Sequence, residues 1–263
     1  MNQRLKRNIQ KIYKKKNYKI IYNKKKMNRC FVFFSGNGIY FPDNSEEFYK
    51  TIEIGDRYEW KEISKDIDAK KIIYLRDIKK IWYQKGINNK INDINKIILL
   101  LKKETKKFSE IVLVGSSAGG YIATIIGNFL KKAYVINFAG QFDLKLEGVI
   151  IKNKKYQNIS KKIDNKKIFY FFSNKNKNDL MQYNLIKKKK NITFFKFDSN
   201  VHGPAVSFLV LKKIINMSFM ELKELGKNND SLINPIKFSF TLVSPLKLLL
   251  SIFLKKIRNL IYG

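Results

Sequence analysis

The stretch from residue 111 to residue 120, Ile-Val-Leu-Val-Gly-Ser-Ser-Ala-Gly-Gly, constrains the fold more than any other part of the chain. Four β-favouring apolar residues run into a G-x-S-x-G pentapeptide centred on Ser117, and a helix-like segment follows at once. The turn from strand to helix is so tight that a Cβ two residues either side of the serine would clash, and it holds the serine in a strained conformation. The pattern predicts a hydroxyl that projects above a sheet, beside a helix N-terminus. An ordinary glycine-rich turn has the same composition, so the rest of the chain must decide between these interpretations.

Short apolar segments alternate with helix-like segments along most of the sequence. Over residues 88–108, for example, isoleucine and leucine recur at spacings of three and four, with lysines on the other face. The alternation predicts an α/β fold, with a mainly parallel sheet covered by helices on both faces. We expect the first two strands to pair as an antiparallel edge. The expected strands are residues 18–22, 30–35, 71–75, 110–114, 133–138, 168–172 and 191–197; the other expected helices are residues 118–131, 180–190 and 205–216, with a helix start at 42–45.

The chain divides into three parts by composition. Residues 1–17 form a basic N-terminal segment with a frayed start, residues 18–230 one α/β domain, and residues 231–263 a basic amphipathic tail. Within the domain, residues 144–167 are largely polar and basic, which indicates a surface excursion. In the tail, Ser244-Pro245 is a good helix start, and the apolar residues that follow share one face opposite lysine and arginine. Such a helix over 244–262 either contacts an anionic membrane surface or packs on its own domain or a partner.

Composition excludes several classes of protein. A chain of 263 residues at 44% hydrophobic can bury a substantial core, and its only cysteine, Cys30, allows no internal disulfide and no multi-ligand zinc site. We expect no metal and no cofactor. The absence of a secretory signal and of any run of about 18 apolar residues favours a cytoplasmic protein, in contact with the inner membrane face if the tail binds lipid.

The formal net charge of +33 has two interpretations. One is attraction to an anionic partner. The other is coding bias, because lysine, asparagine and isoleucine are all used heavily and lysine often decorates solvated surfaces. No zinc-finger spacing, RNP-like aromatic strand or basic heptad region is present, so we expect no nucleic-acid partner. The oligomeric state does not follow from the sequence.

Polar residues of catalytic type follow the expected strands, and the carboxyl ends of parallel strands meet at one edge of a sheet. A serine hydroxyl needs a base, and the only histidine, His202, lies in a loop after the last expected strand, followed by Gly203-Pro204. The position favours His202 as the general base for Ser117. The polar residues at this edge are Asn37, Asp77, Ser117, Asp143, Asp179 and His202.

The third catalytic member must orient the imidazole and stabilise its charged form. Asp179 lies between serine and histidine in the chain, which matches the order Ser, Asp, His, but it is six residues beyond Ser173. Asp143, after the strand that follows the nucleophile helix, is the main alternative. Asp198 precedes His202 by only four residues and is expected to serve its own loop. We expect Asp179 to be the acid.

Taken together, the elbow at 115–119, the loop Ser35-Gly36-Asn37-Gly38, an acid loop and a terminal His202-Gly203 resemble the α/β-hydrolase superfamily over residues 30 to 217. The resemblance implies a serine hydrolase that forms an acyl-enzyme on Ser117, with an oxyanion hole made by the backbone N–H groups of Asn37 and Ala118. The chain departs from the common pattern in three respects: it lacks a His-Gly oxyanion motif, its acid is unusually placed, and it has no evident lid domain.

A narrower resemblance concerns the segments around Arg76-Asp77, Trp82-Tyr83 and residues 178–182, which are similar to those of small bacterial hydrolase-like proteins associated with surface polysaccharide. It implies a carbohydrate-linked ester as substrate. Trp82 and Tyr83 either line a pocket or cover the sheet edge. The function we expect is a serine esterase; the alternatives are an acyltransferase with the same triad, and a non-catalytic hydrolase-fold protein that binds anionic membrane or polysaccharide.

Overall fold

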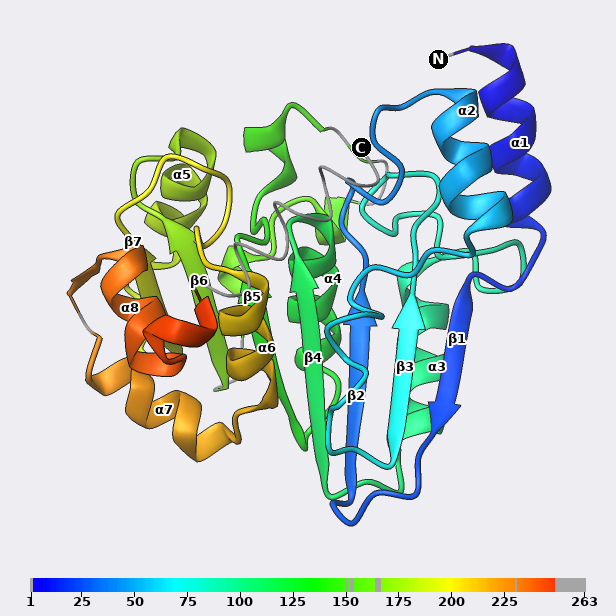
Figure 1. Ribbon diagram of the computed structural model, residues 1–263. Coiled ribbons are helices and arrows are strands. Elements are labelled where there is room, and N and C mark those ends of the chain that lie inside the picture. Colours follow the sequence, from blue (N-terminus) through cyan, green and yellow to red (C-terminus); the bar gives the residue numbers. More distant parts are fainter. Residues whose placement is uncertain (1, 150, 152–153, 164–166, 230, 249–263) are drawn as a thin grey trace.

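An eight-stranded sheet forms the centre of the described chain, which in this computed structural model comprises residues 2–149, 151, 154–163, 167–229 and 231–248 (Figure 1). The spatial order of the strands is β1-β3-β2-β4-β5-β6-β7-β8, and all neighbours are parallel except β1 and β3. The predicted α/β class and mainly parallel sheet are confirmed. The strands are β1 (Tyr18–Tyr22), β2 (Arg29–Phe34), β3 (Lys71–Leu75), β4 (Glu110–Ser116), β5 (Ala133–Phe138), β6 (Ile168–Ser173), β7 (Ile192–Phe197) and β8 (Leu232–Ile233).

The expected antiparallel pairing of β1 with β2 is wrong. β1 pairs with β3, with Ile20 opposite Ile73, and β3 lies between β1 and β2. The connection over 23–28 is long enough to pass across two strand spacings of about 10 Å, so it does not force a hairpin. β3 and β4 then lie on opposite sides of β2, so the strand order changes direction at β2, and ligand sites of such sheets lie at the carboxyl ends of the strands at this point.

Both faces of the sheet are covered, because the strands are apolar on both sides. In β2, Cys30, Val32 and Phe34 belong to one buried cluster, and Phe31 and Phe33 belong to the other. The first cluster packs against α3 and α4, and the second against α6, α7 and α8 (Figure 1). The helices of the described chain are α1 (Gln3–Tyr13), α2 (Ser45–Phe48), α3 (Ile94–Thr105), α4 (Ala118–Gly127), α5 (Lys177–Ile186), α6 (Phe208–Asn216), α7 (Phe219–Lys227) and α8 (Pro235–Leu242), with a π-helix η1 (Tyr49–Ile54) and 3₁₀ turns η2 (Leu144–Glu147), η3 (Lys154–Tyr156) and η4 (Ser160–Lys162).

The N-terminal segment is a helix, where the sequence suggested a frayed start. Leu5, Ile9 and Ile12 of α1 recur at helical spacing and are buried in a small cluster with residues of α2 and η1. Lysine and arginine on the exposed side of α1 concealed this apolar stripe in the overall composition. The basic residues of the segment therefore accompany an amphipathic helix that packs on the domain.

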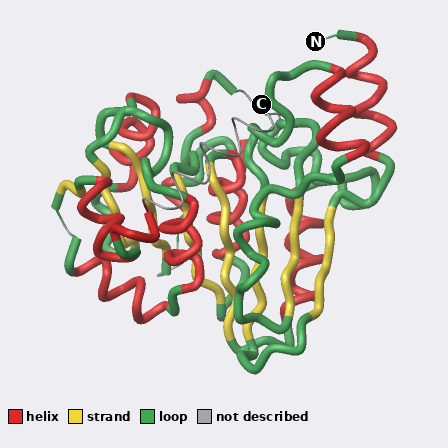
Figure 2. Tube along the Cα trace, viewed as in Figure 1, coloured by secondary structure: helices red, strands yellow, loops and turns green. Residues whose placement is uncertain are grey.

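Two segments outside the regular helices and strands contribute buried residues to the core. The excursion over 144–167 is basic outside, but Tyr156, Ile159 and Ile163 are buried in the core cluster that contains α4. The described residues 55–70 form no helix or strand and cross the other face of the sheet, where Tyr58 and Ile63 are buried (Figure 2).

Of the amphipathic helix expected over 244–262, only the start can be described. Residues 245–248 are helical, and the remainder lies outside the described residues. Among the residues that are described, no helix has both the length and the apolar character needed to cross a membrane.

Candidate active site

The elbow around Ser117 has the geometry that the pentapeptide predicts. Ser117 follows β4 and precedes α4 with φ 52° and ψ −121°, a strained backbone conformation for a residue with a side chain. A Cβ on Gly115 would lie 2.2 Å from the backbone of Gly119, and a Cβ on Gly119 would lie 2.4 Å from the carbonyl oxygen of Phe34. Only glycine fits at either position, so the turn presents the Ser117 side chain, half-buried, at the carboxyl edge of the sheet.

Asp179 and His202 are in direct contact. Oδ1 of Asp179 lies 2.6 Å from Nδ1 of His202, and Oδ2 accepts the N–H groups of Ser173 at 3.0 Å and Gly203 at 2.9 Å. The Asp179 side chain is fully buried, whereas that of His202 is 43% exposed. The hydrogen bond to Asp179 raises the pKa of His202 above its ordinary value of 6.5, against the opposite effect of its partial burial.

The histidine loop lies against the strand next to the elbow. Gly203 has φ 82°, and a Cβ at this position would lie 3.8 Å from the Cβ of Ala139. Ala139 follows Phe138, whose carbonyl oxygen accepts the N–H of Ser117 at 2.9 Å. The hydroxyl of Ser173 donates to the Gly203 carbonyl and fixes the loop to β6. The loops that carry serine, acid and histidine therefore lie along one stretch of the sheet edge. Among the described residues Asp179 and His202 are hydrogen-bonded, whereas no hydrogen bond joins His202 to Ser117, whose Oγ accepts from the side chain of Gln141.

The other aspartates at this edge have structural partners. Asp143 caps η2 through Lys145 N at 2.9 Å and accepts from the Asn158 amide at 2.6 Å. Asp198 forms an ion pair with Lys175 at 2.7 Å.

Asp77 is buried and organises the loop after β3. Its carboxylate accepts the backbone N–H groups of Lys79, Ile81 and Tyr83 at 2.8–3.1 Å. Burial raises the pKa of Asp77 above its ordinary value of 3.8, against these hydrogen bonds. Asp77 therefore stabilises the loop that follows β3.

The loop after β2 approaches the elbow closely enough to share a site with it. A Cβ on Gly36 would lie 3.0 Å from the carbonyl oxygen of Ser116. Within the described part of the chain, the backbone N–H groups of Asn37 and Ala118 have no hydrogen-bond acceptor. Both are thus free to bind an oxygen atom that enters from outside.

Glu59 was not among the candidates from the sequence. Its carboxylate accepts the N–H of Gly36, and burial raises the pKa of Glu59 above its ordinary value of 4.5. It lies in the irregular segment 55–70, which has no pattern that predicts where its side chains point. No sequence signal identified it.

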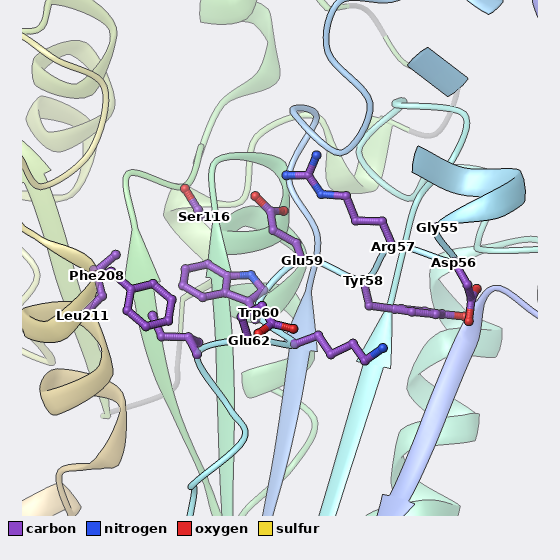
Figure 3. A pocket seen from close by; sticks show the side chains of 12 residues that line it. Gly55, Asp56, Arg57, Tyr58, Glu59, Trp60, Glu62, Ser116, Phe208 and Leu211 are labelled. Atoms are coloured by element: carbon purple, nitrogen blue, oxygen red, sulfur yellow. The ribbon is translucent and has the colours of Figure 1, made fainter. Parts of the chain in front are cut away.

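A cavity of about 510 Å³ opens beside the elbow. Trp60 stacks on Phe33 and Phe138 and donates its indole N–H to the carbonyl of Phe34 at 3.0 Å. Figure 3 shows side chains of α6 reaching the cavity from the side opposite residues 55–62. The cavity has an apolar wall and a polar rim; its lining includes Arg57, Glu59, Trp60, Ser116, Phe208 and Leu211.

Among the described residues, no cluster of three or more histidine, cysteine, aspartate or glutamate side chains is placed to hold a metal ion. The chemistry available at this edge is that of a serine, an imidazole, a carboxylate and free backbone N–H groups.

Strand order, the elbow after β4 and the loops that carry Asp179 and His202 after β6 and β7 define an α/β-hydrolase fold. A model of an uncharacterised protein family, UPF0227, matches residues 67–193. A search of curated protein sequences found no significant match.

Several solved structures are similar to this chain at low sequence identity. The capsule O-acetyltransferase of Neisseria meningitidis serogroup A is 16% identical, with a TM-score of 0.48 over 81% of this chain and 93% of that chain. A lipase-esterase related protein from Clostridium acetobutylicum is 14% identical, with a TM-score of 0.43 over 83% and 100%. Enterochelin esterase from Shigella flexneri is 11% identical, with a TM-score of 0.40 over 71% and 50%. The fold assignment rests on the strand order and elbow of this chain.

Proposed function

We propose that this chain is a serine hydrolase of the esterase type, which cleaves a carboxylic ester through an acyl-enzyme on Ser117. The observation that carries the proposal is the 2.6 Å contact between Asp179 Oδ1 and His202 Nδ1 at the edge where the strained Ser117 lies. A serine hydroxyl becomes a nucleophile when an oriented base accepts its proton, and a carboxylate on Nδ1 provides that orientation.

Acylation begins with proton transfer. Because Nδ1–H of His202 donates to Asp179, Nε2 is left unprotonated and accepts the proton of Ser117 as Oγ attacks the ester carbonyl. The tetrahedral intermediate collapses, the bond to the leaving alcohol breaks, and Nε2 returns the proton to that alcohol. The product of this half-reaction is an ester of Ser117 and a neutral imidazole.

The developing oxyanion needs donors that are already in position. The N–H of Ala118, at the start of α4, and the N–H of Asn37, in the loop after β2, are the donors we assign to it. Neither is engaged elsewhere in the described part of the chain. Loss of one such donor typically costs about 10²–10³-fold in turnover.

The cavity beside the elbow supports a substrate with both apolar and polar surface. Trp60 and Phe208 offer ring faces, whereas Arg57 offers a charged guanidinium group and Glu59 a carboxyl group. A sugar ring combines the same two kinds of surface, so we propose an acylated carbohydrate. Water and a carbohydrate hydroxyl are the two acceptors for the acyl group, and mass spectrometry of products formed with an added methyl glycoside distinguishes hydrolysis from transfer.

Active-site labelling tests the proposal. A fluorophosphonate probe should label the wild-type chain at Ser117, and Ser117→Ala should abolish both labelling and hydrolysis of p-nitrophenyl acetate. The matched control is Ser109→Ala. The Ser109 hydroxyl donates to Asn28 at 2.9 Å, at the opposite edge of the sheet, so this variant should label like wild type.

Two results would overturn the proposal. Labelling that persists in Ser117→Ala means that another nucleophile reacts. A folded wild-type chain that is neither labelled nor active on any of a panel of acylated sugars and short esters favours the alternative, a non-catalytic hydrolase-fold binding protein.

A further inference from the structure

A glutamine contacts the nucleophile. The side-chain amide of Gln141 donates from Nε2 to Oγ of Ser117 at 3.2 Å, and Gln141 is only 3% exposed. Gln141 follows β5, two residues after Ala139, which has φ 50° and so belongs to the small set of non-glycine residues in the left-handed region. The strained backbone directs this buried amide toward the elbow.

Trp82 fixes the orientation of that amide. Its indole N–H donates to Oε1 of Gln141 at 3.1 Å. An indole nitrogen is only ever a donor, so the amide must present its oxygen to Trp82 and its NH₂ group to Ser117. The indole N–H of Trp82 therefore requires that Gln141 act as a hydrogen-bond donor toward Ser117 Oγ.

The loop that carries Trp82 is itself held in an unusual conformation. Lys80, Trp82 and Tyr83 have φ values of 52°, 54° and 59°, and the buried Asp77 accepts three backbone N–H groups of this loop. Backbone strain of this kind persists only where surrounding contacts impose it, and it is frequent at functional sites. Asp77, Trp82 and Gln141 thus form a continuous support that ends on the reacting oxygen.

We propose that Gln141 is a further catalytic residue, which donates a hydrogen bond to Ser117 Oγ and assists its departure from the acyl-enzyme. This inference rests on the proposed function. In deacylation, water attacks the acyl carbon and gives a proton to His202 Nε2; the bond between the acyl carbon and Oγ then breaks, and the proton passes to Oγ. Oγ gains negative charge as this bond breaks, so the hydrogen bond from Gln141 strengthens in that transition state, while the amide keeps its own protons.

Acylation should depend less on Gln141. There Oγ is the nucleophile, and a donor to its lone pair orients it but lowers its electron density. A variant that slows deacylation more than acylation therefore indicates catalytic assistance, whereas a purely structural defect slows both half-reactions.

The experiment compares pre-steady-state bursts of p-nitrophenol from p-nitrophenyl acetate. Gln141→Met keeps the side-chain length and removes the donor; it should slow deacylation by about 10- to 100-fold, the effect of a lost hydrogen bond to a charged group, with acylation within about threefold of wild type. The burst should approach one equivalent per active site, and intact-mass measurement should detect the acetylated chain. Trp82→Phe, which frees the amide to rotate, should give a smaller change in the same direction and tests the inference even if Gln141→Met does not fold.

Gln157→Met is the matched control. This glutamine is also buried, but its amide donates to the Val149 carbonyl at 2.7 Å and accepts the N–H of Ile151 at 2.9 Å, so the variant should keep the wild-type burst and steady-state rates. The inference is overturned if folded Gln141→Met loses acylation and deacylation in equal proportion, or loses neither, while the wild type is still labelled at Ser117. A wild-type chain that takes up no acyl group overturns the proposed function and this inference with it.

Discussion

Oδ1 of Asp179 lies 2.6 Å from Nδ1 of His202, and the other oxygen of the same carboxylate accepts the N–H of Gly203 at 2.9 Å. One buried carboxylate therefore fixes both the imidazole and the backbone of the residue after it. Because Oδ2 also accepts the N–H of Ser173 at the end of β6, the histidine loop is tied to the rigid sheet. The imidazole is thus oriented by a carboxylate of α5 that is also bonded to the end of β6, both outside the histidine loop.

Asp179→Asn should lower kcat by about 10⁴-fold. The carbonyl of asparagine can accept the N–H groups of Ser173 and Gly203, which leaves its NH₂ group facing Nδ1 of His202. Nδ1 must then accept, so Nε2 carries the proton and cannot take one from Ser117. The measurement is steady-state hydrolysis of p-nitrophenyl acetate, with circular dichroism to show that the fold is retained.

Asp143→Asn is the control for that change. Asp143 caps η2 and bonds Asn158, and asparagine can still cap a helical turn, so kcat should stay within a few-fold of wild type. If Asp143→Asn instead abolished turnover and Asp179→Asn did not, the acid role would move to Asp143.

The acid limb of the pH profile of kcat/KM should report His202. In the proposed mechanism the neutral imidazole is the base. Its hydrogen bond to Asp179 raises its pKa above 6.5, so kcat/KM should fall as the pH drops through that raised pKa. In Asp179→Asn the main cause of the raised pKa is gone and partial burial still lowers it, so the limb should move to lower pH. Profiles between about pH 5 and pH 9 test this. A limb that stays in place or moves to higher pH would show that another group controls it.

The sequence predicted the elbow and every strand except the two-residue β8 (Leu232–Ile233), because the elbow and the longer strands depend on local pattern. Asp179 lies six residues beyond Ser173 at the end of β6, which is an unusual spacing for a catalytic acid, but the structure explains it. Asn176 is the N-cap of α5 and accepts the N–H of Asp179 at 3.1 Å, so the first helical turn returns the carboxylate toward Ser173. Six residues of chain therefore cover little distance in space.

Other features depended on long-range contacts that leave no local pattern. Gln141 contacts the elbow and Glu59 contacts Gly36 of the loop after β2; both lie in irregular segments, and neither belongs to a spaced motif. A glutamine after a strand suits an ordinary loop as well as an active site. The pairing of β1 with β3 could not be predicted either, because the two possible partners of β1, which are β2 and β3, are apolar strands of similar composition.

Cys30 should be inert in the folded chain. It is fully buried in β2, and desolvation raises the pKa of its thiol to about 12, so almost no thiolate exists at neutral pH. Ellman's reagent should titrate one thiol in guanidinium chloride and essentially none under native conditions, with Cys30→Ala as the blank. Rapid stoichiometric reaction of the native protein would mean that the sheet opens readily at β2.

Gly119→Ala should destabilise the fold by about 1–3 kcal/mol and reduce turnover. The added Cβ would lie 2.4 Å from the carbonyl oxygen of Phe34 and 3.1 Å from that of Ser35, both backbone atoms, so α4 and the end of β2 must separate. This separation also moves the loop of Asn37 away from the elbow. Gly38→Ala is the control, because nothing lies within 4 Å of its Cβ position, and it should change the free energy of unfolding by at most about 0.5 kcal/mol. Urea denaturation measures both variants, and equal stabilities would contradict the claim that close backbone approach at the elbow requires glycine.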